Sequence, residues 1–307
     1  MNRQKKFVEM MEALIGKSIN LGDPIGQNKV ELEASCAKLK DELGTEFVVN
    51  PNEGNEPCPF YCSSIDKPFD FVFIGMNPGK VLDAQNELHL FSWENTTWQE
   101  LADFCVPTDI REKMNGYQLV KKNSVESEFW KFFLRLHIAL TTNEIFNKWE
   151  ELEKNNKDVE KSFIDHISAH SILNADLIPY KFRKTKRFNV TKILGDTNYR
   201  KYFQKLVNFI ETESAPDAWI VFYATTDTVK KLLKNFAPAW TVPKNSHLKL
   251  RADETKKYSH FYLFAKGQRK ILLSPFLLTP KSTSSIYNNI NILVDAMKNF
   301  ERKLSLR

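Results

Sequence analysis

The residues best suited to chemistry follow a short apolar run, Phe69-Asp70-Phe71-Val72-Phe73-Ile74, which leads into Gly75-Met76-Asn77-Pro78-Gly79. The run is rich in aromatic and β-branched residues, so it predicts a buried strand. Pro78 cannot donate to a strand ladder, and glycine adopts backbone angles that other residues avoid, so the strand must end in a tight loop. In open α/β sheets, ligands bind at loops beyond the carboxyl ends of strands. This loop is the first candidate for a binding site, and an ordinary turn is the alternative.

The loop and the residues after it resemble the first motif of the uracil-DNA glycosylase superfamily. Gly75-Met76-Asn77-Pro78-Gly79 is similar to the loop of the single-strand-selective monofunctional branch, and Ala84-Gln85 stand at the same offset as in that branch. Phe91 follows one residue later than the family spacing. The resemblance implies a three-layer α/β/α sandwich with a mostly parallel central sheet. It also implies an enzyme that removes a base from DNA.

The resemblance gives each loop residue a role. Asn77 would position the attacking water without readily taking its proton, so the reaction would rely on stabilising the leaving base and an oxocarbenium-like sugar. The backbone amides around Gly75 and Met76 would hold a base oxygen, and Phe91 would stack on the flipped pyrimidine. Gly79 stands where strict uracil enzymes carry a tyrosine, so bases with C5 substituents become admissible. The alternatives are a loop-stabilising role for Asn77 and a core position for Phe91.

A second polar pair lies between His170 and Tyr180, where alternating polar and apolar residues predict a strand that leaves the sheet at Pro179. The family reads the pyrimidine edge with an asparagine at the end of a central strand, and Asn174 matches that position. An amide offers the base both a donor and an acceptor. Asp176 is not part of the family pattern. Its carboxylate would accept from the exocyclic amine of a cytosine-type base, or it is a surface charge.

The end of the expected last strand, Ile271–Leu273, resembles the family's second motif, normally His-Pro-Ser-Pro. Here Ser274 stands where the family has the histidine that stabilises the departing base. Either another group replaces that histidine, with His247 and His260 upstream as candidates, or the departing base needs less stabilisation. The residues beyond Ser274 that would wedge into the space of the flipped nucleotide or otherwise contact DNA are Phe276, Leu277, Leu278 and Lys281.

The charges are distributed unevenly along the chain. Residues 1–174 carry 19 Lys and Arg against 28 Asp and Glu, and residues 175–307 carry 25 against 10. This asymmetry predicts a face that meets the phosphates of single- or double-stranded DNA, and a merely solvated basic surface is the alternative. A basic segment with interleaved Phe182 and Phe188 is the best candidate for a nucleic-acid contact. Its charged residues are Lys181, Arg183, Lys184, Lys186 and Arg187.

The composition describes a globular protein, with 42% hydrophobic and 27% charged residues among 307. Membrane spans need about 20 apolar residues in a row, and no run approaches that length. The first residues do not resemble a signal peptide, so we expect an intracellular protein, cytoplasmic in a prokaryote. We also expect a monomer. Four scattered cysteines favour reduced thiols over a metal cluster. We expect no cofactor and no metal.

Periodicity predicts an N-terminal helical and loop extension over residues 1–68, followed by one α/β domain over residues 69–307. His137 lies within an apolar helical pattern and is interpreted as a packed histidine. Residues 44–68 are expected to be mostly loop, and residues 150–161 a solvated helix end or loop. The expected helices cover residues 1–18, 29–43, 127–149, 197–212, 225–236 and 286–300, with a further one starting at Thr96-Thr97. The expected strands cover residues 69–74, 218–224, 258–265 and 271–273.

These observations predict a monofunctional DNA glycosylase that hydrolyses the N-glycosidic bond of a flipped uracil or modified pyrimidine and leaves an abasic site. No catalytic lysine is indicated, so strand cleavage is not expected. Two alternatives remain open. One is a glycosylase for a hypermodified cytosine in bacteriophage DNA, which would serve antiviral defence. The other is a catalytically inactive DNA-binding or inhibitory module of the same fold.

Overall fold

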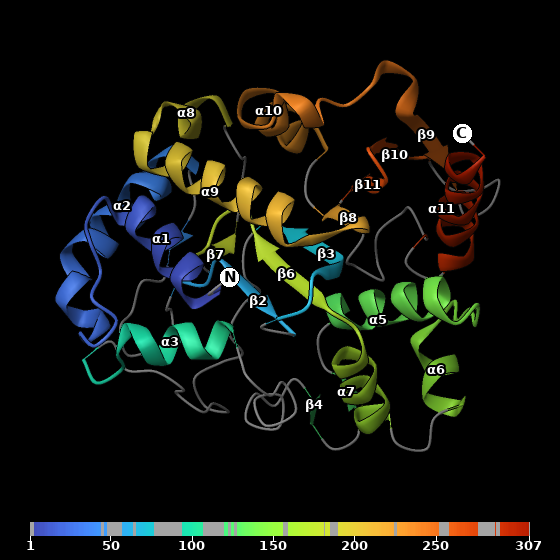
Figure 1. The fold of residues 1–307 in the computed structure, drawn as a ribbon, viewed down its shortest axis with the longest axis horizontal. Coiled ribbons are helices and arrows are strands. Elements are labelled where there is room, and N and C mark those ends of the chain that lie inside the picture. The colour runs from blue at the N-terminus through green and yellow to red at the C-terminus, as the bar shows by residue number, and fades with distance from the viewer. Residues whose placement is uncertain are drawn as a thin grey trace.

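The computed structural model describes residues 3–43, 46–47, 57–63, 66–76, 94–106, 120–121, 124–125, 128–155, 159–180, 182–184, 190–223, 226–251, 258–275, 286 and 289–306. Its main feature is a mixed sheet of seven strands with helices on both faces (Figure 1). The fold is therefore α/β, as the alternation of apolar runs and helical patterns predicts. None of the helices in these ranges is long and apolar enough to cross a lipid bilayer.

The order of helices and strands along the chain is consistent with a sandwich that has a sheet at its centre. The helices are α1 (Arg3–Ile15), α2 (Lys29–Leu43), α3 (Trp98–Cys105), α5 (Glu128–Thr141), α6 (Trp149–Asn155), α7 (Val159–Ala169), α8 (Val190–Gly195), α9 (Thr197–Glu213), α10 (Thr226–Phe236) and α11 (Ile290–Ser305). The strands are β1 (Glu46–Phe47), β2 (Phe60–Cys62), β3 (Phe69–Gly75), β4 (Val120–Lys121), β5 (Ser124–Val125), β6 (Ile172–Asp176), β7 (Phe182–Lys184), β8 (Ser214–Tyr223), β9 (His247–Leu250), β10 (Ser259–Lys266) and β11 (Arg269–Ser274).

The sheet has the strand order β2-β6-β3-β8-β11-β10-β9. Its four inner strands β6, β3, β8 and β11 run parallel to their neighbours among the four. The strand β2 at one edge and the strands β10 and β9 at the other pair antiparallel. The expected parallel sheet is thus present at the centre, and antiparallel strands extend it on both sides.

Helices cover both faces because the inner strands bury side chains on both sides. In β3, Val72 and Ile74 belong to a core shared with α1 and α9. Phe71 and Phe73 point the other way, into a core shared with α5 and α11. Figure 1 shows α1 and α9 on one side of the sheet and α5 on the other.

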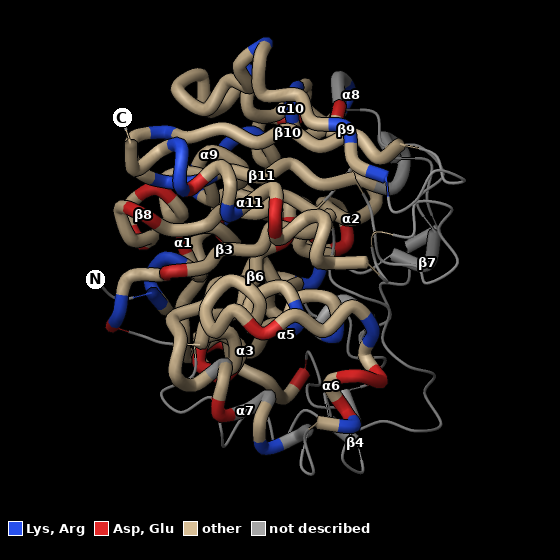
Figure 2. Tube along the Cα trace, turned by 90° about the vertical axis from the view of Figure 1, so that its right-hand side faces the viewer, with Lys and Arg blue, Asp and Glu red and all other residues tan. Residues whose placement is uncertain are grey.

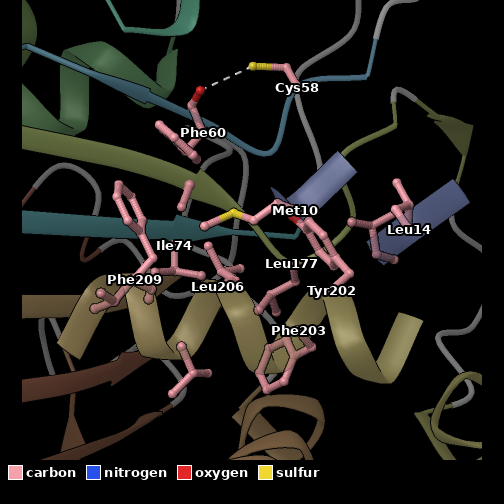
Figure 3. Close-up of a cluster of buried hydrophobic side chains, with 14 of the residues drawn as sticks. Met10, Leu14, Cys58, Phe60, Ile74, Leu177, Tyr202, Phe203, Leu206 and Phe209 are labelled. Atoms are coloured by element: carbon pink, nitrogen blue, oxygen red, sulfur yellow. Dashed lines mark hydrogen bonds between the residues drawn. The ribbon is translucent and has the colours of Figure 1, made fainter. Parts of the chain in front are cut away.

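The core on the α9 side joins the start of the chain to the sheet (Figure 3). Met10 of α1, Phe60 of β2 and Phe209 of α9 meet there, and the rings of Phe60 and Phe209 stack with centroids 4.6 Å apart. Arg3 is buried over the ring of Phe69, at 4.0 Å from its centroid. Its guanidinium also pairs with Glu213 at 3.0 Å, so α1 is tied to both β3 and α9.

The single helix expected over residues 127–149 is wrong. The chain forms α5 up to Thr141, turns at Asn143 with a φ of 67°, and restarts as α6 at Trp149. The reason is local hydrogen bonding: the hydroxyls of Thr141 and Thr142 bond to carbonyls of the last turn of α5. Glu151 then accepts from the backbone amides of Asn147 and Lys148, which lie just before the start of α6. The apolar period continues through the break and hides it.

Two other segments differ in detail from the expectations. Residues 44–68 are expected to be mostly loop, and Phe60–Cys62 within them forms the edge strand β2 against β6. Residues 150–161 hold α6 and the beginning of α7 rather than one solvated helix end. Both elements are short, and a two- or three-residue strand leaves too little alternation for a sequence pattern to detect.

Candidate functional site

The candidate site lies at the carboxyl ends of the four parallel strands. Gly75 of β3 pairs in register with Asp176 of β6 on one side and with Tyr223 of β8 on the other. Tyr223 in turn pairs with Ser274 of β11. These four residues, which we call the strand-end row, stand side by side at the sheet edge where α/β proteins bind ligands.

The strand-end row points to the α5 side of the sheet. Side chains along a strand alternate, so residues two apart share a face. Phe73, Val221 and Leu272 each lie two residues before a member of the row, and all three belong to the core on the α5 side. Tyr223 belongs to that core as well. The motif loop after Gly75 and the second-motif position Ser274 therefore start from one edge and one face.

Asp176 is buried, with 5% of its surface exposed, so the interpretation as a surface charge is wrong. A Cβ added to Gly75 would stand 2.8 Å from Asp176 Oδ1, which means that the carboxylate lies where only a glycine leaves room. Helix α9 holds this strand end, because the hydroxyl of Tyr202 donates to the carbonyl of Asp176 at 2.7 Å. Tyr199 does the same for the carbonyl of Leu177 at 2.7 Å.

The motif loop begins beside the end of β6. The amide of Leu177 donates to the carbonyl of Gly75 at 3.0 Å, and the amide of Ile178 donates to the carbonyl of Met76 at 2.9 Å. Met76 is half-buried and packs against the core on the α9 side. Asn77, Gly79 and Phe91 lie outside the described residues.

Asn174 lies two residues before Asp176 of the strand-end row on the same strand. It pairs in register with Phe73 of β3 and with Tyr61 of β2, so it stands inside β6 rather than at its end. Its side chain is half-buried and shares the face of Asp176, two residues on. The structure thus brings Asn174, Asp176 and the start of the motif loop to the same part of the sheet.

Ser274 is buried, with 1% of its surface exposed, and its hydroxyl donates to the carbonyl of Pro275 at 3.0 Å. The two histidines considered as replacements lie on the outer strands β9 and β10, where His247 Nε2 and His260 Nδ1 are 2.9 Å apart. His260 alternates with Phe261, which belongs to the core on the α5 side. His260 therefore points to the other face of the sheet from Ser274.

The expected DNA-contacting residues lie largely outside the described part of the chain. Arg183 and Lys184 belong to β7, which pairs with β1 in a separate two-stranded sheet. Nothing is described of their side chains. The positions outside the described residues are Lys181, Lys186, Arg187, Phe276, Leu277, Leu278 and Lys281.

Sequence reasoning missed Tyr223, which brings a buried phenol into the strand-end row between Gly75 and Ser274. Its signal is its place at the end of the apolar run in β8. A carboxylate, a phenol and a serine hydroxyl thus occur at the ends of neighbouring strands, and all three residues are buried.

The four cysteines are buried, and none of them forms a disulfide. Cys58 and Cys105 have their sulfurs 3.3 Å apart, whereas the thiol of Cys36 lies near Tyr180 instead. Burial raises the pKa of the Cys36 thiol far above its usual range. The described geometry is consistent with the interpretation of the cysteines as structural thiols.

Three histidines converge elsewhere, at the amino end of β3. His137, His166 and His170 each place one ring nitrogen within 4.8 Å of the other two. Burial, with smaller contributions from the neighbouring histidines, lowers the pKa of His137 to about 2 and that of His166 to about 4. The interpretation of His137 as a packed histidine agrees with its burial but does not predict its contact with His166 and His170. The His166-x-x-x-His170 spacing is the sequence signal that would have found it.

Comparison with known proteins adds no relative. No family model, no curated protein and no solved structure matches the chain.

Proposed function

We propose that the protein is a monofunctional DNA glycosylase that hydrolyses the N-glycosidic bond of a flipped pyrimidine and leaves an abasic site. The strand-end row carries the proposal. It sets the residue that opens the first motif, Gly75, two strands away from the second-motif position, Ser274, on one face of the sheet. The same row contains Asp176, and Asn174 lies on the same face.

The proposed chemistry uses these groups in order. The bond from the sugar carbon to the base nitrogen breaks, and the base leaves with the electron pair. Water held by Asn77 adds to the sugar carbon, and the proton that the water loses neutralises the departing base. Asn174 would bind the polar edge of the base through its amide. Asp176 would accept a hydrogen bond from an exocyclic amine, which favours a cytosine derivative over uracil.

The distribution of charge supports DNA as the substrate. Figure 2 shows Lys and Arg around α10 and β9, and Asp and Glu more often around α6 and α7. Helix α10 begins three residues after Tyr223, at the edge of the sheet that holds the strand-end row. Its Lys231 and Lys234 are exposed and suited to phosphate contacts.

The test is product analysis on single- and double-stranded oligonucleotides carrying uracil, 5-hydroxymethyluracil or substituted cytosines. We expect an abasic product from at least one base, abolished by Asn77→Ala and strongly reduced by Asp176→Asn. Two surface substitutions, Asn208→Ala and Asp217→Asn, serve as matched controls, because both residues are exposed. Full activity of Asn77→Ala on the preferred base would refute the assignment of the loop.

A second function, DNA binding without catalysis, is favoured by one observation. Ser274 replaces the charged group that would stabilise the departing base, and its hydroxyl is already bonded to Pro275. A binding module would hold the same oligonucleotides with salt-dependent affinity and give no abasic product. Binding and product measured on one set of substrates therefore separate the two functions.

A further inference from the structure

The cluster of His137, His166 and His170 is built from three separate parts of the chain. His137 belongs to α5, His166 to the last turn of α7, and His170 to the link between α7 and β6. Figure 1 shows α7 beside α5, on the same side of the sheet. Their rings lie close together, with centroid separations of 4.5–4.8 Å for all three pairs.

The spacing of two of these residues matches a common metal-binding arrangement. His166 and His170 are four residues apart, so their side chains project from one side of the helix end. Two histidines at this spacing supply paired ligands in helical zinc sites. His137 approaches from the neighbouring helix, and its Nδ1 faces Nε2 of His166 within hydrogen-bonding distance.

The third histidine, His170, lies beside the carboxylate of Asp70. Nδ1 of His170 lies 3.4 Å from Oδ2 of Asp70 at the start of β3. Histidines that bind metals usually donate their second ring N–H to a carboxylate or carbonyl, which orients the ring and makes the other nitrogen a better ligand. The contact with Asp70 engages Nδ1 of His170, so Nε2 is the nitrogen left for a metal.

The surroundings of His137 are apolar. Its ring packs edge-on against Phe71 of β3, at 5.0 Å between centroids, and stacks on Phe133 one turn earlier in α5. Only 1% of its surface is exposed. A neutral imidazole has one nitrogen lone pair, and that lone pair is the group that binds a metal ion.

We propose that His137, His166 and His170 bind one Zn²⁺ ion, with Asp70 orienting His170. Imidazole is a ligand that zinc favours, and three of them leave one tetrahedral position for water. Nitrogens bound to zinc stand about 2.1 Å from the ion, so side-chain rotations would have to separate His137 from His166 and bring His170 to the same distance from the ion.

The site would serve the fold, separately from the proposed function. It lies by Asp70 at the amino end of β3, whereas Gly75 of the strand-end row is at the other end of that strand, about 16 Å away by strand geometry. The ion would join α5, α7 and the start of β6. The three histidines come together only in the folded chain. Binding of the ion would therefore favour the folded state and raise the free energy of unfolding.

The first test measures metal in the full-length protein after chelator treatment and reloading with ZnCl₂. We expect one zinc per chain, lost in His166→Ala and in His170→Ala. Both residues are half-buried, so the variants should still fold, as circular dichroism would show. His247→Ala is the matched control, because it removes a histidine from the exposed pair on β9 and β10 and should leave one zinc per chain.

Two further measurements separate a built site from chance binding. Asp70→Asn should still bind one zinc at saturation but weaken its affinity roughly 10–100-fold. Addition of zinc to stripped protein should raise the melting temperature of the parent and of His247→Ala, and not that of His166→Ala. Cobalt loading should give the visible absorption of a tetrahedral nitrogen site. Absence of stoichiometric zinc from the reloaded parent, or equal loss in His247→Ala, would overturn the proposal.

Discussion

At the scale of single residues, the candidate site depends on a close approach between Gly75 and Asp176. The carboxylate occupies the space that any side chain at position 75 would need. A glycine in a buried strand otherwise weakens the strand, because it packs nothing and loses more backbone freedom on folding. Its presence here follows from the position of Asp176.

Gly75→Ala should destabilise the protein by about 1–3 kcal/mol, because the new methyl group would collide with a buried carboxylate. Urea denaturation of the parent and the variant measures this difference. Gly22→Ala is the control, since no atom stands within 4 Å of a Cβ there, and it should be neutral or slightly stabilising. In an Asp176→Ala background the cost of Gly75→Ala should shrink, and an unchanged cost would mean that the collision is not its cause.

The cysteines allow a second prediction at this scale. All four are buried, and burial raises the pKa of the Cys36 thiol. Thiolate is the reactive form, so a thiol reagent at mildly alkaline pH should label none of them rapidly in the native protein. Unfolding in guanidinium should expose all four. Rapid labelling of Cys36 in the folded chain would contradict its described environment.

At the scale of elements, helix α3 shows how a short segment keeps its place. Thr97 accepts from the amide of Glu100 at 3.2 Å, and Glu100 accepts from the amide of Thr97 at 2.7 Å, which forms a capping box. The indole of Trp98 then donates to Asn28 at 2.9 Å in the core on the α9 side. The cap sets the start of α3, and the buried tryptophan sets its orientation.

Thr97→Ala should cost about 1 kcal/mol of unfolding free energy, because it leaves a first-turn amide without its acceptor. The matched control is Thr212→Ala in α9, where the hydroxyl only returns to carbonyls of its own helix. That substitution should have little effect on stability. Equal losses in the two variants would show that the cap contributes nothing specific.

At the scale of the whole molecule, the basic second half of the chain is expected to meet DNA through α10. Lys230 is held 3.4 Å above the ring of Tyr262, while Lys231 and Lys234 are exposed. Phosphate contacts release counterions, so each one lost reduces the dependence of affinity on salt.

The double variant Lys231→Glu and Lys234→Glu should bind single-stranded oligonucleotides more weakly, and the slope of log affinity against log salt should fall by roughly 1–2. Fluorescence anisotropy across a salt series measures both quantities. Lys148→Glu, an exposed lysine beside the acidic helix α6, is the control and should change neither. A loss as large in the control would point to net charge rather than to the α10 surface.

Much of the fold follows from patterns within a few residues. The apolar period predicts α2 at its observed bounds, residues 29–43, and the apolar run predicts β3 within one residue. Thr97 predicts the start of α3, because its hydroxyl can accept from a first-turn amide without any tertiary contact. The break at Asn143 was missed, because hydroxyl bonding at a helix end leaves the apolar period intact.

The candidate site was foreseen only in pieces. The resemblance to family positions predicts Asn174 and Ser274, and Asp176 is predicted from its place on the same strand as Asn174. The burial of Asp176 was not foreseen, because it depends on the tyrosines of α9 and on the glycine of β3. Tyr223 has only one local signal, its place at the end of the apolar run in β8.

The sequence of neighbouring residues was therefore sufficient for the types of most elements and for the apolar faces, since these depend on neighbours along the chain. Two things required the folded molecule. One is the register that aligns Asp176, Gly75, Tyr223 and Ser274, and the other is the meeting of His137 with His166 and His170. Both arise from hydrogen bonding and packing between segments far apart in sequence, which leave no periodic trace in any one of them.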